Sequence, residues 1–163
     1  MCKGALRHQS GISLIEVLIT GLVLTVGLLG AAAVQLKALQ YADAARMDAQ
    51  AGLIAYDILD RIRANVDGNP HRAAAIFASY ALASLDQAPS SGNPGNARDQ
   101  DLFDFKSNIH AFAGKDAEAS IVLHAPSMIV NLQWSDRRAA GQEGALRAFT
   151  LESAVDSHLV LTP

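Results

Sequence analysis

The stretch GISLIEVLIT, residues 11–20, follows a short basic leader and opens a long apolar run. From Ile12 to Val34 the only formally charged residue is Glu16. At about 1.5 Å of rise per residue, a helix over this range is roughly 34 Å long, which is enough to cross the hydrocarbon core of a bilayer. The sequence therefore predicts a membrane-spanning helix close to the N-terminus.

Two ordinary kinds of N-terminal segment compete with this interpretation. A cleaved secretory signal has a shorter apolar region with a small-residue cleavage site after it, whereas this run is longer and continues past residues 31–33 without a clear break. A plain signal anchor fits the length, and Lys3 and Arg7 would hold its N-terminus in the cytoplasm. The anchor does not explain Glu16, because a carboxylate in a membrane helix costs free energy and is usually paired or functional.

Gly11 followed by Ile-Ser-Leu-Ile-Glu-Val-Leu-Ile resembles the leader and N-terminal motif of type IV pilins and of the pseudopilins of type II secretion. In that family a membrane aspartyl peptidase cuts after the glycine and methylates the new N-terminus. The resemblance implies cleavage between Gly11 and Ile12, methylation of Ile12, and Glu16 as the fifth mature residue. The first mature residue is more often Phe in the family, and the helix-kinking proline common in this segment of major pilins is absent here.

Cleavage would create an ammonium group at Ile12, one helical turn before Glu16. This group can pair with Glu16 of the same chain or with Glu16 of a neighbouring subunit, and the second pairing is the registration role that the resemblance implies. Either pairing lowers the cost of keeping the carboxylate in lipid.

Gly27, Gly30 and Ala31 are small residues within the apolar run, and Gly27 with Ala31 forms a small-xxx-small pair. Such residues allow helices to approach closely, so we expect this part of the helix to pack among other helices. The competing explanation is that glycine is generally more frequent in membrane helices.

The chain divides into a removed leader (1–11), a membrane and filament-core helix (12–34) and a periplasmic domain (35–163), which is long enough for one small domain. The full chain has 16 acidic and 13 basic residues, and removal of Lys3 and Arg7 with the leader makes the mature chain more acidic. We therefore expect no nucleic-acid binding, which requires a basic patch. The single cysteine, Cys2, lies in the leader, so the domain is predicted to be stable without the disulfide loop of many major pilins.

The helical periodicity continues beyond the membrane segment and predicts a helix that ends near Asn65, before the breakers at 68–70. One helix of about 80 Å over 12–65, or two helices with a bend, would satisfy it. Its predicted apolar positions are Met47, Ala51, Ile54, Ile58 and Ile62.

Helices are predicted to precede strands in the rest of the chain. This order predicts an α+β fold of the pilin-like kind, in which the long helix packs on a small C-terminal antiparallel β-sheet. The predicted elements are helices at 72–85 and 99–112, a loop at 88–96, and strands at 120–124, 128–134, 145–153 and 158–162. Turns are expected at 125–127 and 136–144, and the second helix should end near Gly114 with Leu102, Phe105, Ile109 and Phe112 on one face.

Residues 56–65 (YDILDRIRAN), the strand ending in Trp134 and the Asp136-Arg137 that follows resemble the PilV, or type IV pilus modification, group of minor pilins. Without that resemblance, the same residues describe an amphipathic helix with an Asp60–Arg63 pair and a core tryptophan. The resemblance implies a low-abundance subunit that starts the pilus or sits at its tip. Its implied partners are other minor pilins, the major pilin, the prepilin peptidase/methyltransferase and inner-membrane assembly proteins. Its implied location is the inner membrane, with the N-terminus cytoplasmic, and then the pilus.

No catalytic, cofactor or metal site is predicted. His71, His110, His124 and His158 lack ligand spacing, and Ser13, Ser135 and Ser153 lack a Gly-x-Ser-x-Gly context. Asp99, Asp101 and Asp104 are the nearest thing to a calcium loop, but the dipole of a helix N-terminus also favours acidic residues, and no loop glycine is present. We expect a structural subunit that is a substrate of an enzyme rather than an enzyme.

Two alternatives remain open. A minor pseudopilin of type II secretion shares the same processing, and only the effect of its deletion on pili or on exoprotein release would separate the two. A signal-anchored periplasmic binding or sensor domain would keep its N-terminus at Met1.

Overall fold

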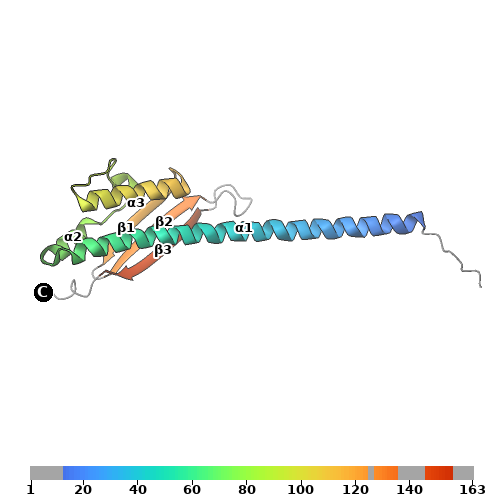
Figure 1. Ribbon diagram of the computed structural model, residues 1–163, viewed down its shortest axis with the longest axis horizontal. Helices are drawn as coiled ribbons and strands as arrows, with labels where there is room; N and C mark the ends of the chain where they lie inside the picture. Colours follow the sequence, from blue (N-terminus) through green and yellow to red (C-terminus); the bar gives the residue numbers. More distant parts are fainter. Residues whose placement is uncertain (1–12, 125–126, 136–145, 156–163) are drawn as a thin grey trace, which may run out of the picture. The chain divides into compact units, whose positions relative to one another are not determined.

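The computed structural model describes residues 13–124, 127–135 and 146–155, and within them the helices precede the strands. This arrangement confirms the α+β prediction (Figure 1). The elements are α1 (Leu14–Asp67), α2 (Ala73–Ser79), α3 (Ala97–Ala113), β1 (Glu118–His124), β2 (Ser127–Ser135) and β3 (Leu146–Ala154), with short 3-10 helices at Pro70–Arg72 and Leu85–Gln87. The predicted strand at 158–162 and the turn at 136–144 lie outside the described residues, as does most of the turn at 125–127.

The chain divides into two compact units, Met1–Tyr41 and Ala42–Pro163. The helix α1 contributes to both, and its helical assignment is uninterrupted from Leu14 to Asp67. Of the two alternatives left by the sequence, the structure therefore has one continuous helix. It ends two residues beyond the predicted Asn65, where the N–H of Gly68 donates to the carbonyl of Ala64 at 3.1 Å.

A strip of α1 forms the centre of the core of the second unit. Ala51, Ile58 and Ile62 are buried as predicted, whereas Met47 and Ile54 are only half-buried. The strip also includes Ala55, Leu59 and Val66, which the periodicity did not single out. It is wider than predicted because α3 and the sheet both pack on α1, so that a broader arc of the helix is covered (Figure 1).

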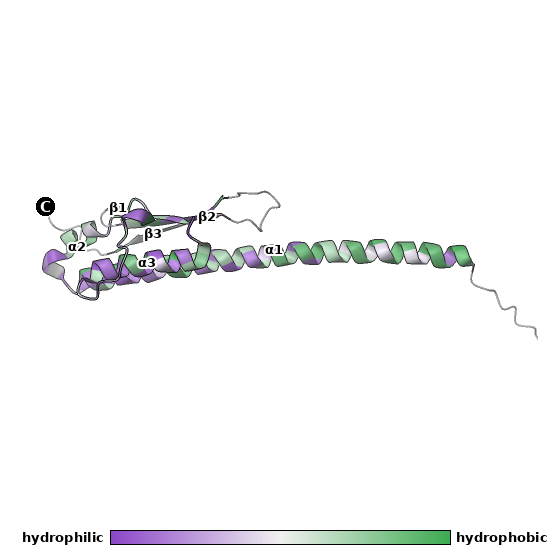
Figure 2. Cartoon of the chain, turned by 90° about the horizontal axis from the view of Figure 1, so that it is seen from above, coloured by the Kyte–Doolittle hydropathy of each residue, from purple (hydrophilic) through white to green (hydrophobic). Residues whose placement is uncertain are grey.

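The three strands form one antiparallel sheet in the order β1-β2-β3. Met128, Val130, Leu132 and Trp134 are all buried, which confirms the period-two prediction for β2. The Trp134 ring, 1% exposed, packs edge-on against Phe112 with ring centroids 5.4 Å apart. Figure 2 shows that α3 carries both hydrophilic and hydrophobic residues, as expected of a helix with one buried face.

The helix predicted at 72–85 is partly wrong. Only α2 is helical there apart from single 3-10 turns, and Tyr80 to Ser84 leave the helix. Leu82 instead forms an antiparallel bridge with Ile121, with N–H···O distances of 3.0 and 2.8 Å in the two directions. Tyr80 and Leu82 are both buried, so tertiary packing overrides the helical propensity of this alanine-rich segment.

The helix α3 agrees closely with its prediction. The side chain of Asn96 caps its start by accepting from the N–H of Asp99, and Gly114 follows its end with φ of 91°. Leu102, Phe105 and Ile109 are buried, and Phe112 is half-buried against Trp134.

Two glycines are expected to respond oppositely to substitution by alanine. Gly114→Ala should lower the free energy of unfolding by about 1–3 kcal/mol, because a positive φ with extended ψ is strained for other residues. Gly52→Ala should raise it by up to about 1 kcal/mol, because an added Cβ lies 3.5 Å from Cζ of Phe149, an ordinary contact, and alanine favours the helix. Urea unfolding of the full chain in detergent micelles, followed by the fluorescence of its single tryptophan, measures both. A change of the same sign in both variants would contradict the opposite backbone demands at these two positions.

Candidate functional site

The membrane-length half of α1 has an exposed apolar surface. Among the described residues, α1 alone is long and apolar enough to cross a membrane, and none of its most apolar window is buried. The exposed side chains include Leu14, Leu18, Leu22, Val26 and Leu29. A contiguous apolar surface of this kind indicates contact with lipid or with other protein segments.

Glu16 lies in the first turn of α1, where its backbone N–H donates to the Ser13 carbonyl at 3.0 Å. Thr20 Oγ1 donates to the backbone carbonyls of Glu16 and Val17, and Thr25 Oγ1 donates to that of Leu22. These hydroxyls are therefore satisfied by their own helix. The Glu16 carboxylate, in contrast, makes no hydrogen bond or ion pair with any residue that the structure describes.

The structure places the predicted packing residues on the same side of α1 as Glu16. Gly27 follows Glu16 by about three helical turns, and Gly30 and Ala31 lie one turn further on. All three are exposed, and a Cβ added at Gly27 or Gly30 meets nothing within 4 Å. Four other predicted residues, Lys3, Arg7, Gly11 and Ile12, lie outside the described residues, so their roles stay predictions.

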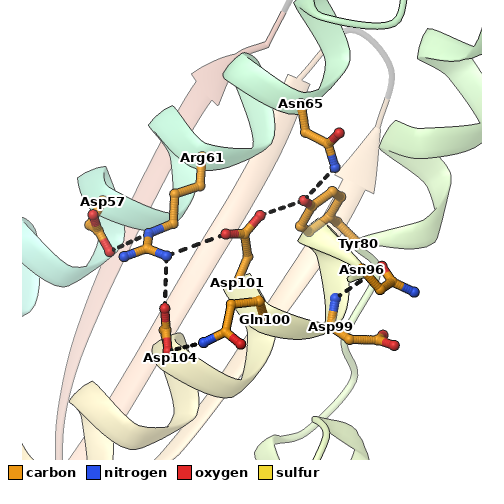
Figure 3. Close-up of polar contacts among 9 residues, drawn as sticks. All are labelled: Asp57, Arg61, Asn65, Tyr80, Asn96, Asp99, Gln100, Asp101 and Asp104. Atoms are coloured by element: carbon orange, nitrogen blue, oxygen red, sulfur yellow. Dashed lines mark hydrogen bonds and ion pairs between the residues drawn. The ribbon is translucent and has the colours of Figure 1, made fainter. Parts of the chain in front are cut away.

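A second polar site joins α1 to α3 through Arg61 (Figure 3). Its Nε donates to Asp57 at 3.0 Å, while Nη1 lies 3.3 Å from Asp101 and 2.9 Å from Asp104. Burial lowers the pKa of Arg61, the three carboxylates raise it, and the net change is upward. One guanidinium thus bridges two helices through three carboxylates.

Tyr80 extends this network to the segment after α2. Its hydroxyl donates to Asp101 at 2.6 Å and accepts from Asn65 Nδ2 at 2.9 Å (Figure 3). Burial, followed by the hydrogen bond to Asp101, raises the pKa of Tyr80 well above its usual value. The hydroxyl is therefore held in its protonated form between α1 and α3.

The acidic residues of α3 that resembled a calcium loop all have protein partners. Asp99 pairs with Arg98 at 2.9 Å, Asp101 binds Arg61 and Tyr80, and Asp104 binds Arg61 and Gln100. In the part of the chain that the structure describes, no group of three His, Cys, Asp or Glu residues is arranged to hold a metal ion. Asp101 and Asp104 are thus accounted for by the contact between α1 and α3, and Asp99 by a local pair within α3.

Arg63 joins α1 to β3. The predicted pair with Asp60 is confirmed at 3.2 Å, and Arg63 Nη2 also donates to Ser153 Oγ at 2.9 Å and to the Ala154 carbonyl at 2.7 Å. These last two contacts could not be read from the sequence, because only the i, i+3 partner is local. They fix the end of the edge strand to the long helix.

Comparisons with protein-family models, with curated proteins and with solved structures find no match to this chain. Its function is therefore inferred from its own residues and geometry.

Replacement of Arg61 should destabilise the second unit. We expect Arg61→Met to lower the free energy of unfolding by about 1–2 kcal/mol, because Asp101, only 13% exposed, loses its cation, although Arg61 itself is 35% exposed and partly screened. Arg46→Met, at an exposed arginine on the same helix, should change it by less than about 0.5 kcal/mol. Urea unfolding in detergent measures both, and equal effects would exclude a specific role for Arg61.

The stability contributed by Tyr80 should depend on pH. Since its pKa is raised in the folded chain, the unfolded chain releases the phenolic proton first above about pH 10, and stability falls there by up to about 1.4 kcal/mol per pH unit. Tyr80→Phe should be less stable than the parent by about 1–2 kcal/mol at pH 8, and the difference should narrow toward pH 11. Urea titrations at both pH values test this, and a constant difference would contradict it.

Proposed function

We propose that this chain is a minor pilin of the type IV pilus, acting in assembly initiation or in the tip complex after prepilin peptidase cleavage. The main support is Glu16, whose carboxylate has no partner among the described residues and lies at the start of an exposed, membrane-length apolar helix. A buried or lipid-embedded carboxylate requires a counter-charge. Cleavage after Gly11 would supply one at Ile12, a helical turn away.

The proposed sequence of events follows the chain. Lys3 and Arg7 keep the leader in the cytoplasm during insertion. The peptidase removes the leader after Gly11 and methylates Ile12, whose ammonium group then pairs with Glu16 of the same or a neighbouring subunit. This pairing sets the register of the subunit as its helix moves from lipid into the helical core of the filament.

The small residues support close packing during that transfer. Gly27, Gly30 and Ala31 lie on the side of α1 that carries Glu16, and a Cβ added at Gly27 or Gly30 meets nothing within 4 Å. Helices can approach closely along such a surface. The same side of the helix would therefore hold both the charge that sets the register and the surface that packs.

The second unit is proposed to be a non-enzymatic domain that contacts other subunits. Its most elaborate side-chain network consists of groups that satisfy one another, because Arg61 is bound by three carboxylates and the Tyr80 hydroxyl has two partners. The proposed partners are other minor pilins, the major pilin, the prepilin peptidase/methyltransferase and inner-membrane assembly proteins.

Glu16→Ala tests the proposal most directly. We expect mass spectrometry to find Ile12 at the N-terminus of the variant, as in the parent. Its recovery in sheared pili should fall at least about tenfold, which corresponds to a loss of about 1.4 kcal/mol in assembly. Thr20→Ala is the matched control one turn away, since its hydroxyl bonds only to its own helix and recovery should be unchanged.

Other outcomes would redirect the assignment. Normal pilus recovery of Glu16→Ala would contradict the registration role. An N-terminus at Met1 in native membranes would contradict processing and favour an anchored periplasmic binding or sensor domain. Loss of exoprotein release, with intact pili, on deletion of the chain would favour a minor pseudopilin.

A further inference from the structure

On the face of the sheet opposite α1, polar side chains lie together in the part next to the apolar Val122 and Ile129. Strand alternation buries Ala119, Ile121, Val130 and Leu132 on the core side and places the intervening residues on the other side. These outward residues include Glu118 and Ser120 of β1, Asn131 and Gln133 of β2, and Thr150 of β3. None of these five is a lysine or arginine, the long cationic side chains common on solvated surfaces.

A hydrogen-bonded ladder fixes the middle of this face. Ser120, Asn131 and Thr150 are directly opposite one another in the sheet register. Thr150 Oγ1 donates to Asn131 Oδ1 at 2.9 Å, and Asn131 Nδ2 lies 3.4 Å from Ser120 Oγ. The amide of Asn131 is thereby oriented from both sides, so its remaining hydrogen-bonding capacity points in set directions.

A groove of about 230 Å³ lies beside this ladder. It is lined by Ala83, Glu118, Ala119, Ser120, Asn131 and Gln133. Ala83 reaches it because the neighbouring Leu82 is paired with Ile121 at the edge of β1. Glu118 and Gln133 are opposite one another in register, and neither side chain is hydrogen-bonded to any residue in the described part of the chain. The groove thus combines a fixed amide with two free polar side chains.

The lining chemistry restricts the ligand. A phosphate or other anion would meet the Glu118 carboxylate without a compensating cation among the lining residues. A single exposed carboxylate contributes at most about 1 kcal/mol to the binding of a cation. An apolar ligand would find only alanine methyl groups. Amides and hydroxyls, in contrast, both donate and accept, as do the hydroxyls of a neutral sugar.

We propose that this groove binds a neutral saccharide. Its volume is below the roughly 300–1,000 Å³ of pockets for drug-sized ligands, which fits one or two sugar units rather than a long chain. The oriented amide of Asn131 would bind a sugar hydroxyl, and the side chains of Gln133 and Glu118 would bind others from the rim of the groove. The small side chain of Ala83 leaves room for the ligand. This binding is independent of the processing and registration roles of the N-terminal segment.

The full chain in mild detergent, applied to an array of neutral, sialylated and sulfated glycans, tests the proposal. We expect binding to neutral glycans and at least tenfold weaker binding by Gln133→Ala and by Asn131→Ala. The Gln133 side chain has no hydrogen bond to any other described residue, so Gln133→Ala should fold normally. This variant therefore still tests the proposal if Asn131→Ala is unstable. Glu152→Ala, exposed on the same face outside the groove, is the matched control and should bind like the parent.

Three results would overturn the assignment. In the first, the parent protein binds no neutral glycan, or it binds charged glycans alone. Another is equal binding by the parent and Gln133→Ala. The third is reduced pilus recovery of Gln133→Ala without glycan binding by the parent, which would identify the groove as a protein contact. Under the proposal, Gln133→Ala is processed and recovered in pili normally, so this test and that of Glu16 fail separately.

Discussion

The second unit depends on one buried strip of α1, because the sheet and α3 both pack on it. Ala51 and Ala55 are small enough to allow close approach near Gly52, where the Phe149 ring of β3 lies against the helix. Ile58 and Ile62 supply bulk farther along the same strip. Two layers that share one helical surface cannot be separated from it independently, so the strip makes the packing of this unit cooperative.

Two arginines lie on either side of the buried strip of α1 and bind the elements that pack on it. Arg61 and Arg63 are two residues apart on α1, which places them on nearly opposite sides of the helix. Arg61 binds Asp101 and Asp104 of α3, and Arg63 binds the end of β3. Apolar packing provides most of the stability, whereas these directional contacts select which elements lie on each side. The hydrogen bond from the Tyr80 hydroxyl to Asp101 likewise holds the segment that pairs with β1 against α3.

The first unit uses the same helix in a different environment. Its apolar side chains are exposed and the Glu16 carboxylate has no partner among the described residues. In the proposed function, lipid, the processed chain end and other subunits supply the groups that satisfy them. In the proposed minor pilin, this unit makes the contacts that assemble the subunit into the filament. The outer face of the sheet, away from α1, carries the groove that is proposed to bind a saccharide.

The sequence by itself determined the features that depend on neighbouring residues. These are the end of α1 near Asn65, the alternation that buries Trp134, the extent of α3, the Asp60–Arg63 pair and the isolation of Glu16 in an apolar run. The structure decided that α1 is one helix rather than two, and the cleavage site at Gly11 and Ile12 stays a prediction. Only the tertiary structure decided that Tyr80 to Ser84 leave the helix, that Arg61 binds Asp101 and Asp104, and that Ala83 and Asn131 line one groove. The physical reason is the distance along the chain over which each interaction acts. Periodicity and capping act between residues a few positions apart. The contacts that join Arg61 to α3, or Leu82 to Ile121, span about forty residues and form only once core packing has brought the two segments together.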